Sequence, residues 1–265
     1  MKIVTAGEFL WDVFEAGEYL GGAPFNFAAH AHRLGHDVRL VSAVGDDERG
    51  DRALEAMRRI GLPADFVPRV AHPTGVVSVS LNASGEPDFE IHRPGAYDFL
   101  QFDPRLIEFQ TDWLYFGTMV QTPAIAEMIE KIPARRFYDV NLRRNCYTRE
   151  LVERLKCKAD AIKLNEHELA TLGWQIEDLP AKYKCVTRGA RGCVVMIGDD
   201  YAECAGYPVR VADTVGAGDA FAAAFLHGIG EGWAAAKIGD FANRLGALVA
   251  SRPGAVPVWT VQEIR

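Results

Sequence analysis

The sequence lacks several features that would place it in common classes of protein. It has five cysteines in 265 residues, an odd and scattered set without any C-x-x-C pair. This argues against a disulfide framework and a zinc site, and it predicts reduced thiols in a cytoplasmic protein. The start, from Met1 to Glu8, reads as a strand and lacks the long apolar region of a signal peptide.

The sequence also lacks the charge that draws proteins to polyanions. Its formal net charge is −7, which gives no general attraction to nucleic acid or to an anionic membrane. No apolar run is long enough to span a bilayer. No G-x-G-x-x-G follows the first predicted strand, which disfavours a nicotinamide-dependent dehydrogenase. Internal repeats, low-complexity tracts and long linkers are also missing.

The patterns that are present alternate between strand and helix along the chain. The length suits one large α/β domain over residues 1–265, and the apolar share of 49% is that of an ordinary globular protein. Alternation predicts a mainly parallel sheet covered on both faces, with ligands at the carboxyl ends of its strands. The predicted strands are 2–6, 38–44, 113–116, 136–140, 161–164, 185–187 and 193–196, and the predicted helices include 26–34, 51–60 and 123–131.

One region breaks this alternation. Residues 74–81 and 88–92 each alternate between apolar and polar side chains, and the turn residues 82–87 lie between them. This pattern predicts a β-hairpin. With residues 11–20 the hairpin is predicted to form a small sheet over the site, so that 11–20 and 74–92 act as a lid. The alternative is an edge hairpin of the main sheet.

The most specific stretch is D-T-V-G-A-G-D, residues 213–219. It follows an extended alternating run at 207–211 and precedes a helix-forming run, which predicts a strand-to-helix junction. Gly216 and Gly218 let an anion approach unsatisfied N–H groups at a helix N-terminus, where the helix dipole also attracts it. Asp219 can accept a proton from an attacking hydroxyl, which suits phosphoryl transfer. An ordinary glycine-rich turn is the alternative.

This stretch resembles the motif of the ribokinase-like (PfkB-type) carbohydrate kinases. Residues 21–28, G-G-A-P-F-N-F-A, resemble the N-terminal signature of the same family. Gly21 and Gly22 let backbone approach a polyol, and Asn26 offers a donor and an acceptor to adjacent hydroxyls. The alternative is that Asn26 only caps the helix it begins. Asp12 resembles the family's sugar-binding aspartate, with a solvated loop acid as the alternative.

Other segments resemble those that bind phosphate, metal ions and the nucleotide in this family. Arg143, in D-V-N-L-R after a predicted strand, can reach a phosphate. Asn165 and Glu168 share a face of a first helical turn, and the resemblance favours magnesium held through its waters over a capping box. The resemblance assigns nucleotide binding to Lys163, Asn165, Thr187, Gly189, Gly192, Gly216, Gly218 and Asn243. It assigns potassium to Asp213, Val215, Ala250 and Gly254.

The turn at 187–192 is also consistent with a hairpin. Five of the seven histidines show no metal spacing and are expected on the surface or in packing, namely His30, His32, His36, His92 and His227.

Six segments occur in the family's order and cover essentially the whole chain. The resemblance implies a three-layer αβα sandwich with a small β lid, and an ATP- and magnesium-dependent sugar kinase. Gly7-Glu8, Arg93 to Ala96 and Asp139 to Arg143 look most like fructokinases. In the implied mechanism Asp219 is the base, and the groups that stabilise the phosphoryl oxygens are the N–H groups of Gly216, Ala217 and Gly218 together with Arg143.

The predicted substrate is a neutral ketose, with fructose first, because an ionised Asp12 would repel a sugar acid. Arg93 is the contrary observation, since an arginine near the lid can bind a carboxylate. A 2-keto-3-deoxygluconate kinase, a nucleoside kinase and a non-catalytic sugar-binding regulator stay open as alternatives. The resemblance also allows a homodimer.

Overall fold

The computed structural model describes residues 1–15, 17–81 and 87–264. Its main feature is an eight-stranded sheet in the order β14-β13-β12-β11-β10-β9-β1-β4. The strands from β4 to β12 run parallel, and β13 and β14 are antiparallel additions at one edge. The mainly parallel sheet is therefore confirmed. These strands are β1 (Lys2–Ala6), β4 (Asp37–Val41), β9 (Trp113–Gly117), β10 (Arg135–Asp139), β11 (Ala161–Asn165), β12 (Tyr183–Thr187), β13 (Cys193–Ile197) and β14 (Asp200–Cys204).

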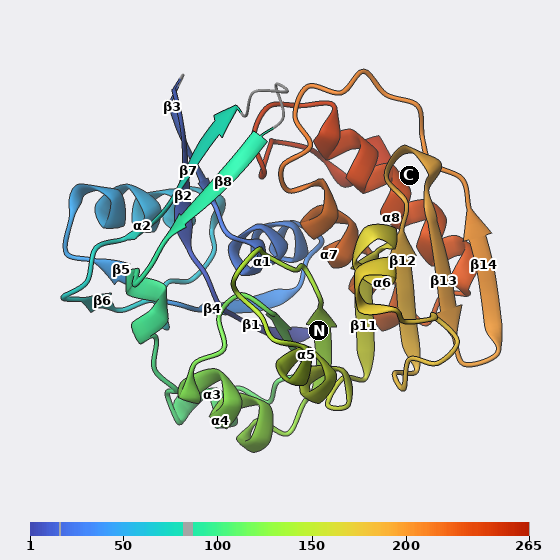
Figure 1. Ribbon diagram of the computed structural model, residues 1–265, viewed down its shortest axis with the longest axis horizontal. Helices are drawn as coiled ribbons and strands as arrows, with labels where there is room; N and C mark the ends of the chain where they lie inside the picture. The colour runs from blue at the N-terminus through green and yellow to red at the C-terminus, as the bar shows by residue number, and fades with distance from the viewer. Residues whose placement is uncertain (16, 82–86, 265) are drawn as a thin grey trace.

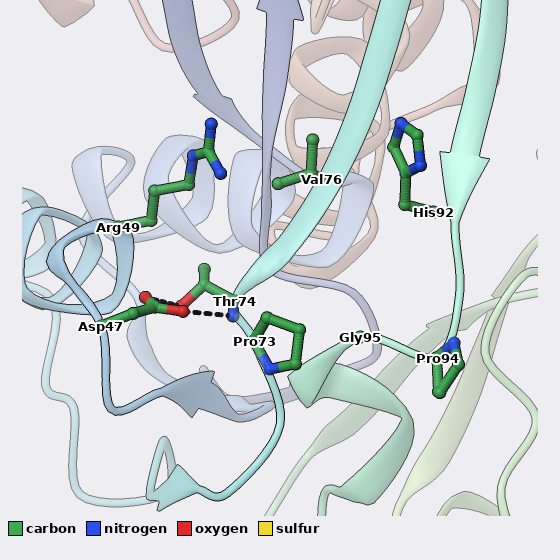
Figure 2. Close-up of a pocket in the computed structure, with 8 residues that line it drawn as sticks. All are labelled: Asp47, Arg49, Pro73, Thr74, Val76, His92, Pro94 and Gly95. Atoms are coloured by element: carbon green, nitrogen blue, oxygen red, sulfur yellow. Dashed lines mark hydrogen bonds between the residues drawn. The ribbon is translucent and has the colours of Figure 1, made fainter.

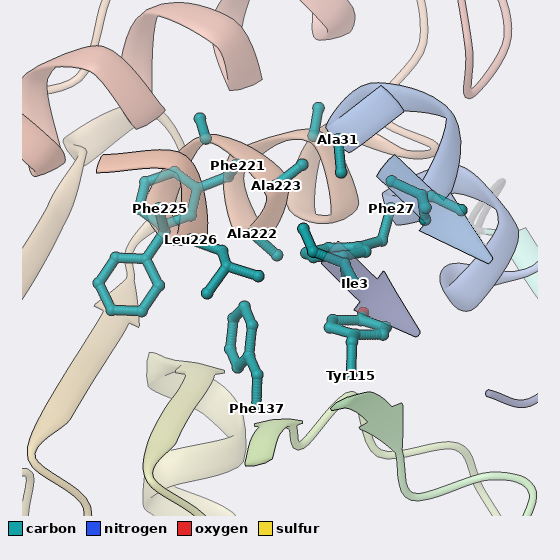
Figure 3. Close-up of a cluster of buried hydrophobic side chains, with 14 of the residues drawn as sticks. Ile3, Phe27, Ala31, Tyr115, Phe137, Phe221, Ala222, Ala223, Phe225 and Leu226 are labelled. Atoms are coloured by element: carbon teal, nitrogen blue, oxygen red, sulfur yellow. The ribbon is translucent and has the colours of Figure 1, made fainter. Parts of the chain in front are cut away.

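Helices cover both faces of this sheet, because alternate residues of each central strand point to opposite sides. Ile3, Tyr115 and Phe137 belong to one buried cluster, which includes side chains of α1, α7 and α8. Figure 3 shows these three side chains against Phe27 and the apolar side of α7. The opposite face packs against α4, α5 and α6. Among the described residues, no helix is both long and apolar enough to cross a membrane.

The helices are α1 (Ala23–Arg33), α2 (Glu48–Ile60), α3 (Arg105–Glu108), α4 (Pro123–Lys131), α5 (Arg149–Lys156), α6 (Glu166–Leu172), α7 (Ala217–Gly230) and α8 (Ala235–Ala250). Short 3-10 turns occupy Ala96–Phe99, Gly189–Arg191 and Val261–Ile264, and β5 (Val44–Gly45) pairs with β6 (Arg69–Val70). Several boundaries differ from expectation. The helices α1 and α2 each begin three residues before the predicted 26–34 and 51–60, β12 begins two residues before the predicted 185–187, and the predicted strand 38–44 divides into β4 and β5.

A second sheet stands apart from the first. It has four strands in the order β3-β2-β7-β8, namely β2 (Leu10–Phe14), β3 (Gly17–Gly21), β7 (Gly75–Leu81) and β8 (Pro87–His92). Figure 1 shows it rising from the body beside α1. The hairpin therefore pairs with the 11–20 region, and the edge-hairpin alternative is wrong. Five residues of the predicted turn, 82–86, lie outside the described residues.

The predicted strand at 207–211 does not form. These residues cross from β14 to α7 without pairing, and Val209 and Val211 are exposed. β14 is the edge strand of the sheet, and Pro208 has no N–H group to donate to a ladder. The 213–219 motif therefore joins a loop, not a strand, to its helix.

Candidate active site

Asp213 fixes the loop before α7. Its Oδ1 accepts a hydrogen bond from the N–H of Val215 at 2.9 Å, and its Oδ2 accepts one from Gly254 at 3.1 Å. The carbonyl of Ala250 accepts the N–H groups of Ala212 and Asp213 at 2.9 and 3.2 Å. The four residues assigned to potassium thus lie where the loop before α7 contacts the end of α8 and the segment that follows it.

Gly216 is the N-cap of α7 and lies in the left-handed region, with φ of 77°. A Cβ there would lie 2.5 Å from the carbonyl oxygen of Ala255, so only glycine fits. The N–H of Ala217 donates to the Thr214 carbonyl at 3.3 Å, whereas those of Gly216 and Gly218 have no backbone acceptor in the described chain. Of the three predicted anion donors, two are therefore free of backbone partners.

Asp219 lies in the first turn of α7 and accepts a hydrogen bond from Asn26 Nδ2 at 2.8 Å. Burial raises the pKa of Asp219 to about 6, although the ammonium of Lys163 opposes that rise. Asn26 lies inside α1, whose N-cap is Gly22, so the interpretation that Asn26 caps the helix is wrong. Its Oδ1 is buried and has no hydrogen-bond partner among the described residues.

Glu8 was given no role from the sequence, although it follows the first strand directly. It is buried, and its Oε1 accepts the N–H of Ala23, the first residue of α1, at 3.2 Å. Burial raises the pKa of Glu8 to about 7, and nearby Arg143 counteracts part of the rise. A Cβ on Gly22 would lie 2.4 Å from the Glu8 carbonyl oxygen, which explains why glycine precedes the helix.

Asp12 lies in the middle of β2, the strand that follows β1 directly. A Cβ on Gly21, in the neighbouring strand β3, would lie 2.6 Å from Asp12 Oδ2. Burial raises the pKa of Asp12 to about 6, opposed by the positive charge of Arg143 and reinforced by the negative charge of Asp213. Asp12 is thus mostly ionised at pH 7, and the small sheet brings it toward the α7 loop.

Arg143 is exposed after β10, and its charge lowers the pKa of Glu8, Asp12 and Asp219. Within the described ranges its side chain has neither a hydrogen bond nor an ion pair, so the guanidinium is available to a ligand. Arg93 differs, because it is paired with Asp98 and its Nη1 donates to the carbonyl of Met119 at 3.0 Å.

Lys163 and Asp139 form a buried ion pair. Lys163 Nζ is 3.1 Å from both carboxylate oxygens of Asp139, and Tyr115 donates to the same carboxylate at 3.0 Å. Lys163 Nζ also lies 3.4 Å from where a Cβ on Gly218 would be, so the cation borders the first turn of α7. The sequence singled out Lys163 as a nucleotide residue but gave Asp139 no role of its own.

Asn165 and Glu168 form the capping box of α6. Asn165 Oδ1 accepts the Glu168 N–H and Glu168 Oε2 accepts the Asn165 N–H, both at 2.8 Å. Glu168 Oε1 also accepts the N–H of Leu142 at 2.8 Å. A carboxylate has about four acceptor positions, so these bonds leave room for water molecules around a cation. The magnesium role stays a prediction.

The predicted nucleotide loop, 187–192, connects the antiparallel strands β12 and β13 and is therefore a hairpin turn. Gly189 and Gly192 have φ of 57° and 91°, values that favour glycine. Asn243, on α8, donates to the carbonyls of Cys204 and Ala205 at 3.3 and 3.1 Å. Thr187 thus ends β12, Gly189 and Gly192 lie in the turn before β13, and Asn243 lies on α8.

A cavity of about 330 Å³ lies elsewhere, between α2 and the small sheet. Figure 2 shows Asp47 bonded there to Thr74, whose N–H and hydroxyl donate to it at 2.8 and 2.6 Å. Asp47 also caps α2, so this contact anchors β7 to the helix. None of the predicted catalytic residues lines the cavity.

Comparisons with family models, with curated proteins and with solved structures all point to carbohydrate kinases. The family model for pfkB family carbohydrate kinases matches residues 3–261. A fructokinase of Klebsiella pneumoniae is 30% identical, covering 96% of this chain and 95% of its own. The fructokinase of Vibrio cholerae, solved with fructose, ADP and calcium ion, has a TM-score of 0.82 at 26% identity over 96% of this chain and 94% of its own. The 2-dehydro-3-deoxygluconokinase of Thermotoga maritima shares the fold, with a TM-score of 0.88 at 20% identity over 100% and 97% of the two chains.

Proposed function

From the premise that the chain belongs to the pfkB family of carbohydrate kinases, and so is an ATP-using sugar kinase, we propose that it phosphorylates a primary hydroxyl of fructose. The observation that carries this proposal is the contact between Asn26 and Asp219. It joins the predicted sugar segment at the start of α1 to the predicted base at the start of α7. A hydroxyl bound beside Asn26 is thereby within reach of Asp219.

Asp219 acts as the general base in this mechanism. Its pKa of about 6 leaves it mainly ionised at pH 7 while keeping it more basic than an ordinary aspartate. It accepts the proton of the attacking hydroxyl late, in a loose transition state. The free N–H groups of Gly216 and Gly218 and the guanidinium of Arg143 stabilise the phosphoryl oxygens.

Oxygen atoms of several other residues would bind the metal ions and border the nucleotide. Magnesium supplies charge neutralisation of the nucleotide phosphates, and Asn165 and Glu168 would hold it through its waters. Asp213, Val215, Ala250 and Gly254 would hold potassium beside the α7 loop. The turn at 187–192 and Asn243 would border the nucleotide.

The case for a neutral sugar is electrostatic. Glu8, Asp12 and Asp219 lie around one exposed cation, Arg143, so the sugar side of the site is rich in carboxylates. Such a site favours hydroxyl donors and disfavours a substrate carboxylate. Arg93, the contrary observation in the sequence, is already neutralised by Asp98. A 2-keto-3-deoxygluconate kinase is the second candidate, because the unpaired Arg143 can bind a carboxylate.

The test is an ADP-release assay with fructose, ribose, adenosine and 2-keto-3-deoxygluconate. We expect fructose to have the highest kcat/KM. If the keto acid exceeds fructose tenfold, about 1.4 kcal/mol of transition-state preference, the neutral-sugar assignment is wrong. The variant Asp219→Asn, prepared in the same way, controls for contaminating kinases. A wild-type protein that releases no ADP with any sugar refutes the kinase proposal itself.

A further inference from the structure

His30 lies on α1 one turn after Asn26, on the same face of the helix. It is completely buried. The sequence predicted only a surface or packing role for this residue. Both of its ring nitrogens nevertheless have hydrogen-bond partners, and those partners come from the C-terminal part of the chain, more than 220 residues away.

The partners fix which nitrogen of His30 carries the proton. Trp259 Nε1 lies 3.0 Å from His30 Nδ1, and an indole N–H can only donate. Nδ1 is therefore the acceptor, and the proton is on Nε2, which donates to the carbonyl of Ala255 at 3.0 Å. Burial lowers the pKa of His30 to about 4, so the ring stays neutral near pH 7.

The carbonyl that His30 holds forms the wall of the α7 turn. A Cβ on Gly216 would lie 2.5 Å from the oxygen of Ala255 and 2.6 Å from its Cα. The preceding residue, Gly254, donates its N–H to Asp213 in the loop before α7. The backbone at 254–255 is thus held from α1 by His30 and from the loop by Asp213, directly against the N-cap of α7.

We propose that His30 is a positioning residue for phosphoryl transfer. On one face of α1, Asn26 holds the carboxylate of Asp219, and His30 holds Ala255 and through it Gly216. One helix thereby sets the base and the anion-binding turn relative to the sugar segment at its own N-terminus. This inference rests on the proposed role of the α7 turn, and α1 is the element that aligns the two halves of the reaction.

Three substitutions separate this role from packing. His30→Leu removes both hydrogen bonds, and His30→Gln keeps an N–H that can reach Ala255. Trp259→Phe keeps an aromatic ring but loses the donor that fixes the tautomer. His32→Leu, on the same helix, is the matched control, because within the described residues the His32 side chain has no hydrogen bond to Ala255 or to the α7 loop and its Nε2 lies near Gly61.

We expect His30→Leu to lower kcat by about tenfold to a hundredfold, with KM for the sugar changed only a few-fold, since misplaced groups lose rate more than binding. His30→Gln should recover most of the loss, Trp259→Phe should show a smaller loss than His30→Leu, and His32→Leu should match the wild type. Equal losses in His30→Leu and His30→Gln, or no loss in either, would overturn the proposal. If His30→Leu does not fold, unchanged kcat in Trp259→Phe overturns it.

Hydrogen exchange gives a readout that does not depend on activity. In His30→Leu and Trp259→Phe we expect faster exchange at the N–H groups of Val215 and Gly254, which Asp213 accepts, and unchanged exchange in His32→Leu. Unchanged exchange at both N–H groups overturns the positioning role even where the kinase is active. Faster exchange in a protein that phosphorylates no sugar keeps the role of His30 and refutes the proposed function alone.

Discussion

Replacement of Asp219 by asparagine is expected to lower activity and raise stability together. Asparagine has nearly the same shape, and its Oδ1 can still accept the hydrogen bond that Asn26 now donates at 2.8 Å. The fold should therefore persist while the general base is lost. Loss of such a base typically costs about a hundredfold to ten-thousandfold in kcat. ATP affinity should stay within a few-fold, because the α7 N–H groups remain.

The gain in stability follows from the pKa of Asp219. Burial raises it from 3.8 to about 6, so the folded protein holds a carboxylate that would ionise more readily in the unfolded chain. The penalty is zero well below pH 3.8, grows between 3.8 and 6, and is complete above 6. About two pKa units correspond to about 3 kcal/mol. This is an upper limit at pH 7, because the side chain is only partly shielded from solvent.

The assay is urea unfolding of wild type and Asp219→Asn at pH 7 and at pH 4.5. We expect the variant to be more stable by as much as about 3 kcal/mol at pH 7, and by much less at pH 4.5, where the folded wild type is protonated. Asp178→Asn, at an exposed position, controls for a general charge effect and should change little at either pH. Near-wild-type turnover of Asp219→Asn would refute its role as base. A variant less stable than wild type at pH 7 would refute the burial argument.

Two other predictions concern the surroundings of this carboxylate. Asp139→Asn leaves the buried ammonium of Lys163 without its partner and should reduce the free energy of unfolding by about 3–5 kcal/mol, whereas Tyr115→Phe, which removes one hydrogen bond to Asp139, should cost about 1 kcal/mol. Similar urea midpoints for the two variants would contradict this. Activity should be higher in potassium chloride than in a bulky organic cation chloride of equal ionic strength, because Asp213 and its carbonyl-rich partner segment border the α7 turn; equal rates would contradict the potassium site.

The sequence alone determined the fold class and the family, because both depend on local patterns. Alternation of strands and helices predicted the mainly parallel sheet, and the helix at 123–131 has the predicted bounds. The sequence singled out Gly216 as a residue that lets an anion approach, whereas its left-handed φ of 77° and the nearby Ala255 carbonyl were found only in the structure. The 213–219 and 21–28 motifs then indicated a sugar kinase of the family that the comparisons show.

Tertiary structure decided what the local patterns left open. Spacing alone cannot separate a helix cap from a ligand contact, and the structure shows that Asn26 bonds to Asp219, 193 residues away, while Asn165 and Glu168 form a capping box. The run at 207–211 had the alternation of a strand but no neighbouring strand to pair with.

The polar contacts of Glu8 and His30 could not be predicted from the sequence either, because their partners are distant in the chain. Glu8 approaches the start of α1 only when β1 and α1 pack together, and His30 meets Trp259 only after the two ends of the chain come into contact. A buried polar group must find a partner, but the chain's path through space chooses which one. The motifs in the sequence indicated phosphoryl transfer to a sugar, whereas long-range packing determined which side chains position the site residues.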